Sequence, residues 1–375
     1  MPLDSLTEAV LARDEVARYI RDVEGASGRE ARTRIEAYLA ELRTTQRYRF
    51  YRALQRPLYP ILRKVERIAE QIGLAADATA AGRVVYVSNH KSHLDYLVEP
   101  LVLDDHGIRP PLVAAGINLF GGALGLLHRH VTGAIPIRRN SKDPVYLATL
   151  RAYVAEVLKQ HDVLYYGEGG RSYGGELKPF KTGLLQAALQ ADRRELSIVP
   201  MAIAYDLVLE ERTLAREALR PRNRLFSQEI ADMVRHAVGY QTRAFVTFGQ
   251  PIPLADVDPE ARRDLVRLSH RVRDAIGLCH KVLPTALVAS VVRPQMTRSE
   301  AADRIDQLLP VLAAEGANLS VRTGRAAVDD GVSRLVERGV LVEARQRLRV
   351  RDRMVLRYYA RTIRHLVERS RKAAH

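Results

Sequence analysis

The chain has 375 residues, 47% of them hydrophobic, so it is long enough to bury a sizeable core and to divide into two or three domains. Its single cysteine, Cys279, excludes a disulfide framework and a cysteine-rich metal site. The formal net charge of +15 favours a phosphate-rich partner: nucleic acid, an anionic membrane or a phosphorylated small molecule. Composition leaves these three open, together with a merely basic solvated surface.

Residues 1–79 are expected to form an N-terminal helical region. Ser5 and Glu8 have the spacing of a helix cap, and Gly28 is expected to end this first helix. A second helical run is predicted to reach about Gln55. The apolar residues from Ile61 to Ile72 have helical spacing and predict a third helix.

No targeting or membrane-spanning segment is expected. Acidic residues interrupt the apolar positions of the N-terminus, which argues against a signal peptide. The longest apolar stretch, Leu112 to Leu127, has 16 residues. A helix needs about 20 to cross a bilayer. The stretch is a candidate apolar channel or interfacial insertion, with an ordinary core strand and loop as the alternative.

Residues 80–285 alternate strand and helix signals and predict an α/β domain. Continuous apolar strands separated by helices are typical of a mixed central sheet flanked by helices. The predicted strands are Val84–Ser88, Pro111–Ala115, Gly133–Ile137, Val163–Tyr166, Ile198–Tyr205 and Ala244–Gly249. The clearest predicted helices are Ser92–Leu103, Pro144–Lys159, Gly183–Leu189 and Pro259–Ile276.

The first motif runs from Asn89 to Leu97. His90 ends a predicted strand and Asp95 lies in the first turn of the next helix, so the turn can bring them into hydrogen-bond reach. A carboxylate on one ring nitrogen fixes the tautomer and leaves the other nitrogen free to take a proton from a substrate hydroxyl. His93 is a poorer partner because residues two apart on a helix face different ways. Ser92 and Asp95 also have capping spacing, so a purely structural role for Asp95 stays open.

The second motif, Gly133 to Arg139, is a strand that ends in two arginines. Arg138 and Arg139 can offer planar, permanently charged forks to a phosphate, with a solvated surface pair as the alternative. The fourth motif, Ile198 to Ile203, is a strand interrupted by Pro200, which is expected to shape a pocket wall.

The third motif, Glu168 to Ser172 with Lys181 following, is the best anion site in the sequence. Gly169 and Gly170 allow close backbone approach, and their amides can face an anion. Arg171, Ser172 and Lys181 would add charge-assisted donors at a helix N-terminus. Glu168 is expected either to contact substrate or to orient an arginine.

Residues 286–375 are expected to form a basic, mostly helical C-terminal domain. Thr297 and Glu300 cap one predicted helix, and another runs from Gly324 to Arg338. A small hairpin is predicted around residues 340–350, and Asp352 caps a last helix that reaches about residue 370. Helices followed by a hairpin suit a winged-helix-like fold.

In their order and spacing, the four motifs resemble blocks I to IV of the glycerolipid acyltransferases, the first block being His-x4-Asp. The resemblance is to the glycerol-3-phosphate 1-O-acyltransferases of the bacterial membrane-associated type, and covers about residues 30 to 367. Further segments that carry it are Ala114–Leu119, Phe248–Leu254 and Tyr358–Leu366. This chain departs from the family pattern at Tyr173, where an arginine is usual, and at Ala360 and Arg361.

The resemblance implies the glycerolipid acyltransferase fold and transfer of a fatty acyl group from acyl-CoA or acyl-carrier protein to the sn-1 hydroxyl of glycerol 3-phosphate, giving lysophosphatidic acid. His90 would be the general base and Asp95 its partner. No cofactor and no metal are expected. The substrate-binding residues would be Arg138, Arg139, Glu168, Gly169, Gly170, Arg171, Ser172, Lys181 and Pro200.

The expected place of the protein is the cytoplasmic face of the cell membrane, as a peripheral protein attracted to anionic lipid by its arginines. Tyr173 leaves another phosphorylated acceptor, such as dihydroxyacetone phosphate, as an alternative. A basic winged-helix nucleic-acid-binding protein is the rival from another class. That rival leaves the first three motifs unexplained, so nucleic acid is not expected as the partner.

Overall fold

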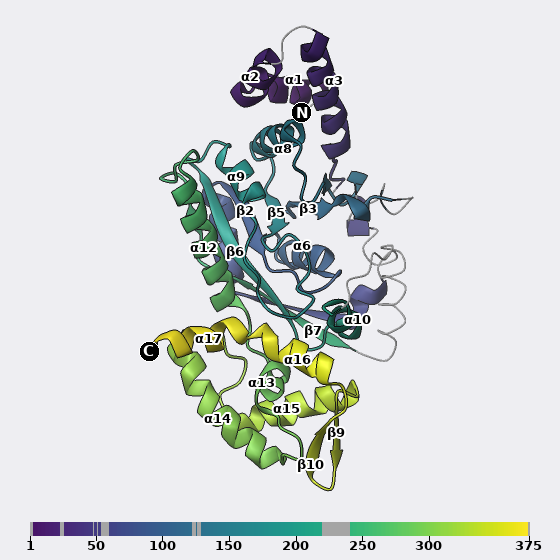
Figure 1. Cartoon of the computed structure of the whole chain (residues 1–375), viewed down its shortest axis with the longest axis vertical. Helices are drawn as coiled ribbons and strands as arrows, with labels where there is room; N and C mark the ends of the chain where they lie inside the picture. Colours follow the sequence, from purple (N-terminus) through teal and green to yellow (C-terminus); the bar gives the residue numbers. More distant parts are fainter. Residues whose placement is uncertain are drawn as a thin grey trace.

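The structure is a computed structural model that describes residues 3–22, 26–47, 49–50, 52–53, 60–121, 125, 129–219 and 241–373. Figure 1 shows a central sheet with a group of N-terminal helices at one end of the molecule and a group of C-terminal helices at the other. No helix among these residues is long and apolar enough to cross a membrane.

The centre of the molecule is an eight-stranded mixed sheet in the order β1-β7-β6-β2-β5-β3-β4, with β8 paired to β6. Strands β6, β2, β5, β3 and β4 are parallel to their neighbours in this series, whereas β7 and β8 run antiparallel to β6. The strand bounds are β1 Val65–Glu70, β2 Arg83–Ser88, β3 Leu112–Gly116, β4 Ala134–Ile137, β5 Val163–Tyr166, β6 Leu196–Tyr205, β7 Thr242–Phe248 and β8 Ile252–Pro253. The predicted mixed α/β sheet flanked by helices is confirmed.

Side chains alternate along β2 between two hydrophobic cores. Val85 and Val87 belong to the core under α8 and α9, whereas Val84 and Tyr86 belong to the core on the opposite face, with α6. Successive residues of a strand point to opposite faces, so a strand buried on both faces is apolar throughout. The helices of the α/β layer are α5 Ile72–Ala81, α6 Asp95–Asp105, α8 Pro144–Val157, α9 Gly183–Leu189, α10 Glu211–Glu217 and α12 Arg262–Cys279, with short 3₁₀ turns at Pro60–Lys64 and Ile117–Leu119.

The N-terminal helices pack on α8 and are shorter than predicted. They are α1 Leu3–Leu11, α2 Asp14–Asp22 and α3 Ala26–Leu42, so Gly28 lies inside a helix rather than ending one. Beyond α3 the backbone leaves the helix because it bonds to a distant segment: Thr45 N donates to Arg129 O at 3.0 Å, and Arg47 N to Val131 O at 3.2 Å.

The helix predicted over Ile61–Ile72 is wrong. Residues 65–70 form β1, which pairs in parallel with β7 from Val65↔Thr242 to Glu70↔Thr247. A short apolar run fits helical and strand periods alike, and here tertiary pairing overrides the helical spacing. The sheet therefore begins within the range assigned to the N-terminal helical region.

The C-terminal part contains the predicted helices and hairpin. Its elements are α13 Pro284–Val291, α14 Arg298–Ala314, α15 Gly324–Glu337, β9 Leu341–Ala344, β10 Arg347–Val350, α16 Arg353–Thr362 and α17 Arg364–Ala373. The capping box of Thr297 and Glu300 is present, and Asp352 caps α16. The last helix is divided in two at Ile363. Apolar residues of these helices join the core on the α6 face of the sheet.

Candidate active site

The candidate site lies at one edge of the sheet. Strands β2, β4, β5 and β6 run in the same direction, so the residues that follow them meet at their carboxyl ends. His90 follows β2, Arg139 follows β4 and Glu168 follows β5. Ligands of α/β sheets commonly bind outside this edge.

His90 and Asp95 form a buried hydrogen-bonded pair. His90 Nδ1 and Asp95 Oδ2 are 2.8 Å apart, and both side chains are buried. The same carboxylate oxygen accepts the backbone N–H groups of Lys91 (2.6 Å) and Ser92 (2.9 Å). The other oxygen, Oδ1, accepts the hydroxyl of Tyr205 at 2.8 Å. Asp95 therefore orders the turn, as the capping alternative supposes, and also holds the imidazole.

Burial governs the protonation of this pair. It raises the pKa of Asp95 to about 6, against the lowering effect of the donors from Ser92 and Tyr205. It also lowers the pKa of His90 well below its usual value, and the charge of Arg171 acts in the same direction. His90 is then neutral near pH 7, with the Nδ1 proton facing Asp95 and the Nε2 lone pair available. The pair can therefore accept a proton from a hydroxyl placed at Nε2.

Beneath the imidazole lies a second polar network that the sequence analysis missed. The ring of Tyr166 stacks on His90 with 4.1 Å between centroids and 15° between planes. Its hydroxyl is 2.8 Å from Glu99 Oε2, and the hydroxyl of Ser88 is 2.5 Å from Oε1. Burial raises the pKa of Glu99 well above its usual value. One signal was available: Glu99 is a lone carboxylate one helical turn after Asp95 in an apolar run.

Glu210 is another residue that no local motif indicated. Its carboxylate accepts the Ser92 hydroxyl at 2.8 Å and the backbone N–H of His93, also at 2.8 Å. Glu210, in the loop after β6, thus fixes the turn between His90 and Asp95 through hydrogen bonds to Ser92 and His93. A residue separated by 117 positions from His93 gives no spacing signal in the sequence.

The third motif is hydrogen-bonded to the first. Glu168 accepts the backbone N–H of His90 (3.1 Å), the Ser172 hydroxyl (2.7 Å) and the backbone N–H of Lys178 (3.2 Å). The Ser172 backbone N–H in turn donates to His90 O at 2.8 Å. Glu168 and Ser172, both predicted to contact substrate, lie within the protein network that joins the two motifs.

Three basic side chains, Arg139, Arg171 and Lys181, lie around Gly169 and Gly170 and are called the cationic cluster below. A Cβ on Gly170 would be 4.0 Å from Arg139 Nη1, and one on Gly169 would be 2.7 Å from Lys181 Cδ. Gly169 has φ +69°, which favours glycine. The charges of Arg171 and Arg139 both contribute to the low pKa of His90, after burial. The cluster is thus electrostatically coupled to the imidazole.

The cluster side chains have neighbours of their own. Lys181 Nζ donates to Asn140 Oδ1 at 2.5 Å. Arg171 is buried, and its guanidinium lies 5.2 Å from the centre of the Tyr173 ring. Tyr173, where the family pattern has an arginine, therefore contacts the cluster.

Arg138 is turned away from the cationic cluster. Its guanidinium forms a fork with Glu41 of α3, with Nε to Oε1 at 2.7 Å and Nη2 to Oε2 at 2.5 Å, and lies 4.9 Å from the centre of the Tyr38 ring. Arg139, in the turn that follows β4, lies instead beside Gly170, so the two arginines have different partners. We leave Arg138 out of the candidate site.

Pro200 lies inside β6, opposite Val87 of β2. It falls where the antiparallel partner of β6 changes from β8, paired at Ile198, to β7, paired from Met201. Its carbonyl accepts the backbone N–H of Gly249 at 2.7 Å. Pro200 is thus placed at a change of strand pairing, and its predicted role in a pocket wall stays a prediction.

Within the residues that the structure describes, no group of three or more His, Cys, Asp or Glu side chains could hold a metal ion.

Comparison with known proteins agrees with these motifs. Residues 65–204 match the family model described as Acyltransferase. The chain is 35% identical over 246 residues to a glycerol-3-phosphate acyltransferase of Aeromonas hydrophila, covering 62% of this chain and 30% of that one. It is 39% identical over 182 residues to a protein of the same name from Pasteurella multocida, covering 46% and 22%. The chain thus spans less than a third of the length of these two relatives.

A solved structure, the 1-acyl-sn-glycerophosphate (LPA) acyltransferase from Thermotoga maritima, is 14% identical with a TM-score of 0.36, covering 72% of this chain and 93% of that one. The family match and the two relatives confirm the resemblance predicted from the four motifs.

Proposed function

We propose that the protein transfers a fatty acyl group to the sn-1 hydroxyl of glycerol 3-phosphate, starting from the match of residues 65–204 to the Acyltransferase family model. The product is lysophosphatidic acid. The single observation that carries the proposal is a neutral, carboxylate-held imidazole coupled to a cluster of basic side chains. The imidazole suits a hydroxyl, and the cluster suits a phosphate on the same acceptor.

In the proposed reaction, His90 Nε2 takes the proton of the acceptor hydroxyl while the oxygen attacks the thioester carbonyl carbon. The charge of Asp95, 2.8 Å from Nδ1, stabilises the imidazolium that forms. The carbon–sulfur bond then breaks, the acyl ester remains on the acceptor, and the imidazolium returns its proton to the leaving thiolate. A thioester is already activated, so we propose no metal and no cofactor for this step.

The cationic cluster is the proposed binding site for the acceptor's phosphate. Arginine forks and a lysine ammonium form charge-assisted hydrogen bonds to phosphate oxygens. Fixing the phosphate would place the hydroxyl of a three-carbon acceptor at the imidazole. Positioning of this kind can lower a barrier by about 7–11 kcal/mol in favourable cases.

Purified protein incubated with glycerol 3-phosphate and palmitoyl-CoA or palmitoyl-carrier protein tests the proposal. We expect lysophosphatidic acid, resolved by mass spectrometry, with the acyl group at sn-1. Dihydroxyacetone phosphate in a parallel reaction tests the alternative acceptor. Acylation of neither acceptor with either donor would refute the proposed function, and the basic nucleic-acid-binding rival would then be tested by its salt-dependent DNA affinity.

We also propose that the protein acts as a peripheral protein at the cytoplasmic face of the membrane. The net charge of +15 supports attraction to anionic lipid, worth about 1 kcal/mol per basic residue near the surface. The stretch 112–127, the candidate acyl-chain channel or insertion, begins with β3, and part of it lies outside the described residues. We expect flotation with anionic vesicles and release by high salt. Binding indifferent to both lipid charge and salt would contradict the electrostatic account.

A further inference from the structure

Residues 172–178, called the bridging loop here, connect the cationic cluster to helices α12 and α16. Gly175 lies at the middle of the loop, and its carbonyl accepts the buried ammonium of Lys91 at 2.7 Å. Gly175 has φ +90°, and a Cβ there would be 2.2 Å from the backbone oxygen of Tyr358 in α16. The neighbouring Glu176 forms an ion pair with Arg361 of α16 at 3.6 Å. The loop is therefore held between the first motif and the C-terminal helices.

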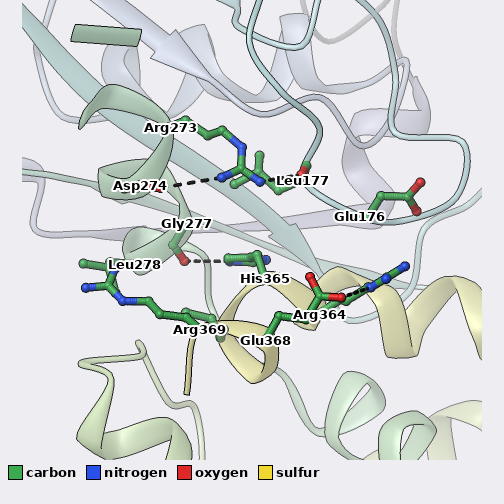
Figure 2. A pocket seen from close by; sticks show the side chains of 11 residues that line it. Glu176, Leu177, Arg273, Asp274, Gly277, Leu278, Arg364, His365, Glu368 and Arg369 are labelled. Carbon is green, nitrogen blue, oxygen red and sulfur yellow. Dashed lines mark hydrogen bonds and ion pairs between the residues drawn. The ribbon is translucent and has the colours of Figure 1, made fainter. Parts of the chain in front are cut away.

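The far end of the bridging loop is held by Arg273 of α12. Figure 2 shows its guanidinium extending from the helix toward the loop. Nη2 donates to Leu177 O at 3.0 Å, and Nε donates to Lys178 O at 3.1 Å. The arginine also borders a cavity of about 450 Å³ between α12 and α17. Its contacts with the loop are thus to backbone carbonyls.

Lys178 connects Arg273 to the cationic cluster. Its ammonium donates to the backbone carbonyl of Arg171 at 2.9 Å and lies 5.3 Å from the centre of the Tyr173 ring. Its backbone N–H donates to Glu168, which also accepts the backbone N–H of His90. A continuous path of hydrogen bonds therefore leads from Arg273 through Lys178 to Arg171.

We propose that Arg273 is a positioning residue, which fixes the bridging loop and thereby holds Arg171 where the acceptor's phosphate binds. The inference rests on the proposed function for the identity of the acceptor, but the hold on the loop is independent of it. By this proposal, helix α12 contributes to acceptor binding, although it lies outside the residues matched by the acyltransferase family model.

The test compares Arg273→Ala with a matched variant on the same helix. Arg267 lies six residues earlier in α12, with a side chain 64% exposed and an ion pair to Asp264 at 3.4 Å. We expect Arg273→Ala to raise the KM for glycerol 3-phosphate about tenfold, within the coupling range for residues of one hydrogen-bond network, and to change kcat by less than about twofold. Arg267→Ala should change neither.

A double-mutant cycle tests the route through Arg171. If Arg273 acts through Arg171, adding Arg273→Ala to Arg171→Ala should raise the KM by less than about twofold further. Effects that simply multiply would overturn this route. Arg273→Lys, which keeps one charged donor, should recover part of the loss, and it replaces the alanine variant in the cycle if that variant does not fold.

Amide hydrogen exchange over residues 172–178 tests the hold on the loop without substrate. We expect faster exchange in Arg273→Ala than in the wild type or Arg267→Ala. Equal exchange in the two variants would overturn the proposal even in an active enzyme. Faster exchange in a protein that acylates no acceptor would leave the hold on the loop intact and refute only the proposed function.

Discussion

The hydroxyl of Tyr205 gives a direct way to test how the catalytic pair titrates. It donates to Asp95 Oδ1 at 2.8 Å, while the imidazole of His90 is held by the other oxygen, so Tyr205→Phe removes one donor without touching the His90 contact. A hydrogen bond to a charged group contributes about 1.5–3 kcal/mol. One pKa unit corresponds to about 1.4 kcal/mol. The pKa of the pair should therefore rise by about 1–2 units.

The sign follows from the charge that Tyr205 stabilises. Loss of its donor destabilises the carboxylate, so the pair takes up a proton more readily, starting from the pKa of about 6 that burial gives Asp95. A pair that has taken up this proton cannot accept one from the substrate hydroxyl. Activity is therefore lost as the pH falls through this pKa, and the acid limb of the profile should move to higher pH in Tyr205→Phe.

The assay is kcat/KM for glycerol 3-phosphate measured from about pH 5 to pH 9, the range in which such a pair titrates. Tyr86→Phe is the matched control, because the Tyr86 hydroxyl is buried and has no hydrogen-bond partner among the described residues. An acid limb that stays in place in Tyr205→Phe, or that moves equally in Tyr86→Phe, would refute the assignment of Asp95 to the titrating pair.

Three further predictions test separate parts of the site. His90→Ala should lower kcat by about 10²–10⁴-fold in a protein that still folds, as checked by circular dichroism, and His93→Ala should lower kcat less. The reverse order would refute the choice of base. Arg139→Ala should raise the KM for glycerol 3-phosphate roughly tenfold or more by loss of a charge-assisted hydrogen bond. Arg138→Ala removes a guanidinium that is paired with α3, so its KM should stay within about twofold of the wild-type value. Equal effects on the KM would contradict the separation of the two arginines. Gly175→Ala should lower the free energy of unfolding by about 1–3 kcal/mol in denaturant titration, because the backbone is left-handed there and has no room for a Cβ; an unchanged value would contradict the close packing on α16.

The sequence by itself determined strands β2 to β7 and the contact between His90 and Asp95, and it missed the short β8. Both depend on local chemistry. An apolar β-branched run such as β2 can be buried on both faces only as an inner strand. The imidazole and the carboxylate are only five positions apart, and the carboxylate is held in the same turn by the N–H groups of Lys91 and Ser92. The same local logic predicted the caps at Thr297 and Asp352.

Only the tertiary structure decided which polar residues surround that pair and which arginine faces it. Tyr205 and Glu210 reach the first motif from more than 100 residues away, and Arg138 is withdrawn by a carboxylate 97 residues earlier in the chain. Residues 65–70, helical by spacing, became a strand because β7 offered an edge to pair with. Such contacts depend on which strands become neighbours, and sheet pairing joins segments whose separation along the chain leaves no periodic trace in the sequence.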